Sequence, residues 1–159
     1  MIDEIRCELE FRADATRGSP GRIVGTLLTY EERARDRAEL FATGALEWPD
    51  DGIILNEQHN RQAPIMRFLP EVRGAAVVID APLPDTSRGR DAATMVRNGT
   101  LRGLSVEFRS LEEDRAGGVR RIRRARLGGA GLVDSGSYGN RVEVRHRGVL
   151  APGRMLGWL

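Results

Sequence analysis

The sequence has no lysine, one cysteine and few aromatic residues. All 25 basic residues are therefore arginine, and 23 acids offset them to a formal net charge of +2. This near balance does not give the basic surface expected of a nucleic-acid-binding protein, and an aromatic content of 5% argues against a surface that stacks bases. The single cysteine, Cys7, excludes an internal disulfide and a zinc site built from several cysteines.

Long apolar runs are also missing. No stretch of about 18 apolar residues is present, and the N-terminal residues do not resemble a secretory signal. We therefore expect no membrane partner and a protein that stays where it is made. At 159 residues the chain predicts one domain over residues 1–147, followed by a tail over 148–159 that either straps the domain or docks on a partner.

Short segments in which apolar and polar residues alternate are the main pattern, and they are typical of strands with one buried face. Residues 5–12 and 22–30 predict a hairpin. Further strands are expected at 53–55, 64–68, 74–80, 101–108, 119–127, 128–133 and 141–145.

Helix signals are fewer. Thr86 or Ser87 is a suitable N-cap for a helix that ends near Gly99, and Gly44 ends a helical turn predicted over 39–46. Residues 112–118 predict a polar hairpin loop. The expected fold class is mainly β with a few helices (α+β), in the form of a small, mostly antiparallel β-barrel decorated by helices.

Ser105 and His59 are the candidates for nucleophilic chemistry. A serine hydroxyl attacks a carbonyl only when a base takes its proton, and imidazole is the usual base. The other histidine, His146, lies between two arginines whose charge disfavours an imidazolium, so His59 is the better base. Pattern alone does not go beyond a small β-rich domain, because neither Gly-x-Ser-x-Gly nor Ser-x-x-Lys is present.

Five segments, taken in order, resemble the prohead proteases of tailed phages, which are capsid-maturation serine proteases related in fold to herpesvirus assemblin. The stretch from Glu39 to Ala45 is similar to the E-x-F-x-x-G-A motif of that family. The other segments are residues 22–28, His59 with 64–67, 85–92 and 103–108. Together they span about residues 20–145.

The resemblance implies a herpesvirus-protease-like barrel and a serine endopeptidase without a metal or organic cofactor. Ser105 is then the nucleophile of an acyl-enzyme mechanism and His59 the general base. The implied substrates are the phage major capsid protein, its scaffolding segment and the chain itself. The implied location is the immature capsid, or prohead, in the cytoplasm of a bacterium that carries the phage or prophage, and a homo-oligomer is compatible with this role.

The third catalytic group is where the chain departs from the family. Many relatives carry an acid at the position that Gly129 occupies here. Asp134 is the nearest acid, whereas Glu107 shares a strand face with Ser105. We favour Asp134, with Glu107 as second candidate and a Ser–His dyad as the alternative. The oxyanion donors could be backbone N–H groups of the turn at 139–140 or the Arg141 side chain, although a solvated strand position is the ordinary explanation of Arg141.

Two other functions fit the sequence. One is a catalytically inactive relative that acts as an internal scaffold or capsid-interaction protein, as the missing acid at Gly129 suggests. The other is nucleic-acid binding through the arginine-rich run at 120–126, although arginines on an exposed strand face are the ordinary explanation of that run.

Overall fold

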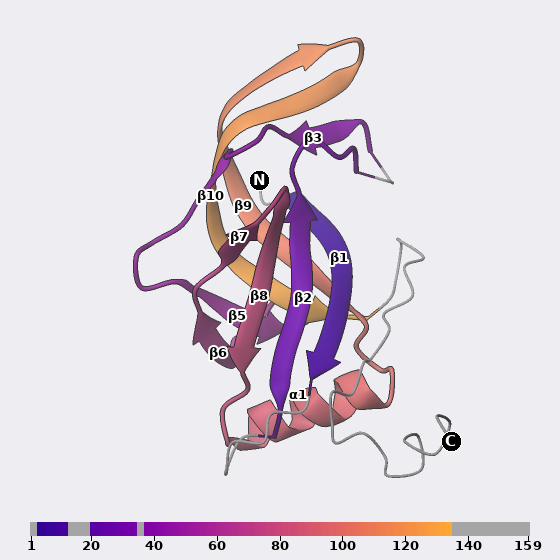
Figure 1. Cartoon of the computed structure of the whole chain (residues 1–159), viewed down its shortest axis with the longest axis vertical. Coiled ribbons are helices and arrows are strands. Elements are labelled where there is room, and N and C mark those ends of the chain that lie inside the picture. Colours follow the sequence, from indigo (N-terminus) through magenta and orange to yellow (C-terminus); the bar gives the residue numbers. More distant parts are fainter. Residues whose placement is uncertain (1–2, 13–19, 35–36, 135–159) are drawn as a thin grey trace, which may run out of the picture.

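A computed structural model of the chain describes residues 3–12, 20–34 and 37–134, which form ten strands and one helix (Figure 1). This composition agrees with the predicted α+β class. In chain order the elements are β1 (Asp3–Arg12), β2 (Arg22–Thr29), β3 (Glu39–Phe41), β4 (Leu46–Glu47), β5 (Ile53–Glu57), β6 (Asn60–Phe68), β7 (Glu71–Arg73), β8 (Ala76–Pro82), α1 (Ser87–Arg97), β9 (Gly103–Ala116) and β10 (Val119–Val133).

The strands form one sheet with the order β6-β5-β10-β9-β1-β2-β8-β7. The predicted hairpin of β1 and β2 is confirmed, and most neighbours are antiparallel. However, β3, β4 and β5 run parallel to β10. Within the described residues β6 and β7 end the sheet without pairing with each other, so the predicted closed barrel is not found. The expected strand at 141–145 and the tail lie outside these residues.

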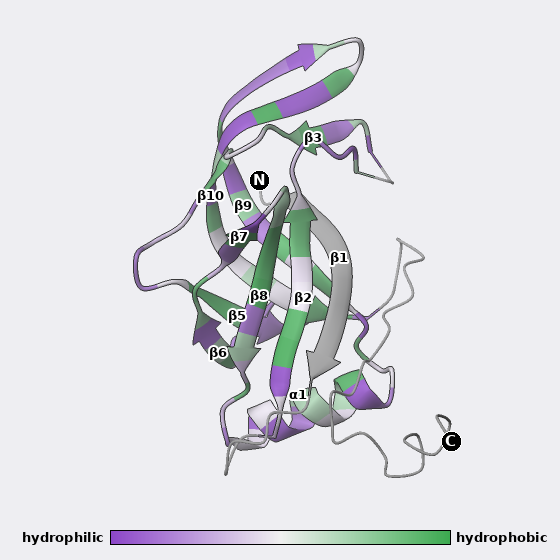
Figure 2. Cartoon of the chain, in the orientation of Figure 1, coloured by the Kyte–Doolittle hydropathy of each residue, from purple (hydrophilic) through white to green (hydrophobic). Residues whose placement is uncertain are grey.

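The core lies between the curved sheet and α1, which crosses one end of it (Figure 1). Apolar residues dominate the visible lengths of β2 and β8 (Figure 2). The helix begins where the Thr86 hydroxyl accepts a hydrogen bond from the Gly89 N–H at 3.1 Å, as expected of an N-cap. Gly89 is required there, because a Cβ atom would lie 2.0 Å from the carbonyl oxygen of Pro84.

The predicted helical turn at 39–46 is wrong. Residues 39–41 form β3, Gly44 lies in a turn with φ of 72°, and β4 follows. Phe41 is buried against Phe108 in an edge-to-face contact with ring centroids 4.8 Å apart. This contact with a residue far along the chain, together with parallel pairing to β10, overrides the local helix signal.

The hairpin predicted at 112–118 is confirmed, but its loop is shorter than predicted, since β9 continues to Ala116 and only Gly117 and Gly118 form the turn. The two strands expected at 119–127 and 128–133 are one strand, β10, with a register shift at Gly128. Beyond the ends of β1 and β5, β9 and β10 continue as a projecting hairpin arm, defined here as residues 109–126, and β3 and β4 pair with its β10 side (Figure 1). Cross-strand ion pairs between its arginines and acids explain how so polar a sequence stays in strands.

Asp80 on β8 joins two arginines from neighbouring strands. The guanidinium groups of Arg22 and Arg73 both hydrogen-bond to its carboxylate, with 2.8 Å between Arg73 Nη2 and Asp80 Oδ2. Burial raises the pKa of Asp80, but the hydrogen bonds from Arg73 and Arg22 outweigh it and leave the pKa below its ordinary value. The carboxylate therefore fastens β2, β7 and β8 together.

Candidate active site

His59 lies in the two-residue turn of the β5–β6 hairpin. Glu57 pairs with Asn60, which leaves Gln58 and His59 as the turn residues, with φ angles of 51° and 58°. Two successive positive φ angles are typical of a type I′ turn, which usually contains Asn or Gly. The Gln58 N–H donates to the Leu132 carbonyl at 2.9 Å and so fastens this strained turn to β10.

Ser105 and Glu107 lie on one face of β9. The residues that alternate with them along the strand, Leu104, Val106 and Phe108, belong to the core. The odd-numbered side chains therefore point to the opposite face. In the register of the sheet, Ser105 pairs with Gly131, and Glu107 pairs with Gly129. Direct antiparallel partners share a face, with Cβ atoms about 5 Å apart.

The glycine pair, Gly129 and Gly131, makes room for the side chains of His59 and Glu107. A Cβ atom on Gly131 would lie 2.8 Å from His59 Cε1 and 2.9 Å from its Nδ1. A Cβ atom on Gly129 would lie 2.9 Å from Glu107 Oε2. The His59 ring therefore occupies the space over Gly131, beside Ser105 and on the same face of the sheet.

Glu107 holds the His59 ring in place. The distance between His59 Nδ1 and Glu107 Oε1 is 2.8 Å, and both side chains are largely buried. An ionised carboxylate can only accept hydrogen bonds. With Glu107 ionised, Nδ1 therefore carries the proton and donates the hydrogen bond to Oε1. With Nδ1 engaged by the acid, proton exchange with a hydroxyl falls to Nε2, as in serine-protease triads.

Ser105 has no exposed surface, and within the described residues its hydroxyl oxygen has no hydrogen-bond partner. The Ser–His hydrogen bond is therefore not formed in this conformation, although the ring lies beside the serine. A buried hydroxyl without a partner costs about 1–3 kcal/mol, so its retention at this position needs an explanation. Catalytic hydrogen bonds commonly tighten only when substrate binds.

Asp134 is exposed and follows β10 directly, and its backbone N–H donates to Gln58 Oε1 at 3.3 Å. Of the two acids that the sequence leaves open, Glu107 contacts the His59 ring, and the geometry favours it over Asp134. The remaining candidates, His146, the turn at 139–140 and Arg141, lie outside the described residues.

Asn56 is a residue that sequence reasoning missed. It pairs in register with Gly131 on the side opposite Ser105, so Ser105, Gly131 and Asn56 form one row across β9, β10 and β5. Asn56 is 4% exposed, and its side-chain oxygen has no hydrogen-bond partner within the described part of the chain. The sequence signal for Asn56 is a polar residue that directly follows the apolar run Ile53-Ile54-Leu55 in a predicted buried strand.

The described residues form neither a metal site nor a membrane-spanning helix. Among residues 3–12, 20–34 and 37–134, no three His, Cys, Asp or Glu side chains gather closely enough to hold a metal ion. In the same ranges, no helix has the length and apolar character needed to cross a membrane.

Comparison with known proteins found a similarity of fold and no similarity of sequence family. No family model and no curated protein matches the chain. The fold is similar to that of the bacteriophage T4 capsid assembly protease gp21, with a TM-score of 0.48 and 15% identity, over 82% of this chain and 98% of that chain. At this level the similarity does not establish a shared activity, and the site is assigned from its own geometry.

Proposed function

We propose that the chain is a serine peptidase in which Ser105 is the nucleophile, His59 the general base and Glu107 the acid that orients His59. One observation carries the proposal. The His59 ring lies over Gly131, the direct cross-strand partner of Ser105, and is hydrogen-bonded to Glu107 at 2.8 Å. Three side chains of the right types thus meet on one face of the sheet, in the order that nucleophilic catalysis requires.

In this mechanism His59 Nε2 takes the Ser105 proton as the serine oxygen bonds to the peptide carbonyl carbon. Glu107 stabilises the imidazolium that forms, because its carboxylate accepts the hydrogen bond from Nδ1. The imidazolium then protonates the leaving amine, and the peptide bond breaks to give an acyl-enzyme. Water, activated by the same histidine, releases the second product and restores the serine.

The burial of Ser105 sets a condition on this mechanism. The serine has no exposed surface, while the His59 side chain is 25% exposed. Substrate therefore enters from the side of His59 and reaches the hydroxyl only when the groups over it move.

The proposed substrates are a phage major capsid protein, its scaffolding segment and the chain itself, cleaved inside the immature capsid. The support is the ordered resemblance of five segments to prohead proteases, two of which contain Ser105 and His59.

The test is co-expression of the chain with the capsid protein of the same phage or prophage. We expect Ser105→Ala to abolish capsid-protein cleavage. The matched control is Ser110→Ala, because Ser110 lies on the same strand and only hydrogen-bonds to Glu113 at 2.9 Å. Unchanged processing by the Ser105→Ala variant refutes the assignment.

The second candidate function is an inactive relative that acts as a scaffold or capsid-interaction protein. The complete burial of Ser105 and the absence of a hydrogen-bond partner for its hydroxyl within the described residues favour it. A fluorophosphonate probe separates the two functions. Acylation of Ser105, located by peptide mass spectrometry, supports the peptidase, whereas folded protein that never labels supports the inactive relative.

A further inference from the structure

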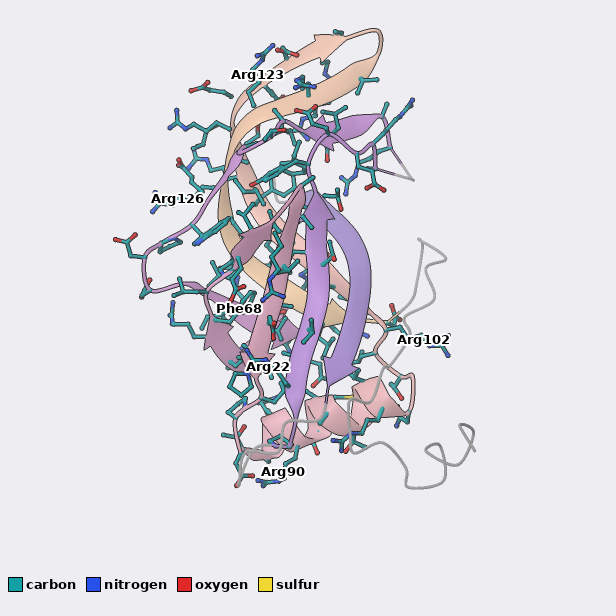
Figure 3. The ribbon with its side chains drawn as sticks, viewed as in Figure 1. Arg22, Phe68, Arg90, Arg102, Arg123 and Arg126 are labelled. Carbon is teal, nitrogen blue, oxygen red and sulfur yellow. The ribbon has the colours of Figure 1, made fainter. Side chains whose placement is uncertain are left out.

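Two arginines lie directly opposite each other on the face of the sheet that carries Ser105. Arg109 on β9 pairs in register with Arg126 on β10, and both side chains are exposed. Figure 3 shows Arg126 extending outward from β10. Like charges in directly opposite positions destabilise a sheet, so this arginine pair needs an explanation.

The rest of the hairpin arm shows how arginines are normally accommodated in this chain. Four of its arginines are paired with acids on neighbouring strands or loops. These are Arg120 with Glu39 and Glu113, Arg121 with Glu31, Arg123 with Asp114, and Arg124 with Glu112. Arg109 and Arg126 differ from these four, and unlike the remaining arginine of the arm, Arg115, they face each other across the two strands.

Within the described residues, no ion pair or side-chain hydrogen bond engages Arg109 or Arg126. Even Glu47, the register partner of Arg126 on β4, contacts Arg124 instead, at 3.6 Å. Two guanidinium groups, each with several N–H donors, are thus left facing solvent side by side.

The arginine pair lies in line with the candidate catalytic groups. Ser105, Glu107 and Arg109 alternate along the same face of β9, and their partners Gly131, Gly129 and Arg126 do so along β10. At about 3.3 Å per residue, Arg109 lies roughly 13 Å along the strand from Ser105. An extended peptide bound at Ser105 covers this distance with about four residues.

We propose that Arg109 and Arg126 form a specificity subsite that binds the carboxylate of an Asp or Glu about four residues from the scissile bond of a peptide substrate. This inference rests on the proposed peptidase function. Paired guanidinium groups bind carboxylates through charge-assisted, often bidentate hydrogen bonds. A bound carboxylate also reduces the repulsion between the two arginines. Both the new hydrogen bonds and this reduced repulsion therefore favour an acidic ligand.

A peptide fits this position better than a nucleic acid. The neighbouring surface of the hairpin arm is lined with acids already paired to arginines, such as Glu112, Asp114 and Glu47. A phosphate chain that continued across this surface would meet these carboxylates, whereas one acidic side chain needs only the two arginines.

The test uses the full chain and a library of twelve-residue peptides with randomised central positions. Cleaved peptides are sequenced by mass spectrometry for the wild type, the Arg109→Gln/Arg126→Gln variant and the control Arg115→Gln, which removes another exposed arginine near the tip of the hairpin arm. We expect the wild type and the control to prefer Asp or Glu at one position about four residues from the cut. The double variant should lose this preference by about tenfold, as expected for two exposed ion pairs.

A charge reversal and a binding measurement keep the subsite separable from catalysis. Arg109→Glu/Arg126→Glu should prefer Lys or Arg at the same position. In a Ser105→Ala background, immobilised protein should retain acidic peptides from the library, and Arg109→Gln/Arg126→Gln should abolish this retention. If the wild type cleaves nothing but the retention is found, the peptidase assignment fails and the subsite stands. Acidic preference that survives in the double variant, or a twelve-nucleotide single-stranded DNA that displaces the acidic peptides, overturns the subsite.

Discussion

Gly131 is the position where one added methyl group should slow the proposed catalysis without unfolding the protein. An alanine Cβ atom there would lie 2.8 Å from His59 Cε1, 2.9 Å from Nδ1 and 3.1 Å from Nε2. Carbon atoms in contact are about 3.5–4.0 Å apart, so the ring has to move by at least about 0.7 Å. A misplacement of about 1 Å can cost roughly 10²-fold in rate, and we expect Gly131→Ala to slow acylation of Ser105 by about this factor.

The neighbouring glycines provide a graded control series. An alanine Cβ atom at Gly129 would lie 2.9 Å from Glu107 Oε2, the movable end of a side chain, so its effect should be smaller. At Gly128 the nearest atom is the Glu107 carbonyl oxygen at 3.7 Å, an ordinary contact, and alanine there should have no effect. None of the three has a positive φ angle, so alanine suits each backbone.

The assay is the rate of fluorophosphonate labelling, followed by intact-protein mass spectrometry, with the melting temperature measured in parallel. The expected order of labelling rates is Gly128→Ala equal to wild type, then Gly129→Ala, then Gly131→Ala, at similar melting temperatures. Wild-type labelling of Gly131→Ala, or equal losses at Gly128 and Gly131, would show that the His59 ring does not depend on the space over Gly131.

Three more predictions test other parts of the structure. Glu107→Gln should reduce peptidase activity by at least about 10²-fold because it removes the charge that stabilises the imidazolium, whereas Asp134→Asn should leave activity unchanged; the reverse result restores Asp134 as the acid. Asn56→Leu should raise the free energy of unfolding by about 1 kcal/mol in urea titrations, because it removes a buried carbonyl without a partner in the described chain; a fall in this free energy contradicts the reasoning. Asp80→Asn should lower the free energy of unfolding at neutral pH. Because the folded pKa of Asp80 is depressed, this difference should be complete above about pH 4 and shrink as the pH falls through that lowered pKa, and a pH-independent difference would rule out the ionised pair as its source.

Local signals were sufficient where a segment's neighbours in the sequence decide its structure. Alternation predicted the β1–β2 hairpin, and Thr86 with Gly99 predicted the helix between them. The spacing of Ser105 and Glu107 alone placed both side chains on one strand face, which is why Glu107 was a candidate acid.

Long-range pairing decided the rest. Which residues of β10 face Ser105 depends on the register shift at Gly128, and no local pattern reports the register between two distant strands. The preference for Asp134 relied on its nearness in sequence to Gly129, whereas the acid that contacts His59 stands on the opposite strand at Glu107. Likewise, residues 39–41 form a strand because Phe41 packs against Phe108, a residue far along the chain.

The glycine pair also determines when the site can exist. Glu107 and His59 are 48 residues apart in the chain, and the strand between their elements in the sheet, β10, is the last one that the structure describes. Until Gly131 has been synthesised and β10 has inserted between β5 and β9, the histidine has no surface on which to lie beside the serine. The order of synthesis therefore keeps Ser105, Glu107 and His59 apart until most of the sheet is complete, so the proposed catalytic groups first meet after the strands around them have folded.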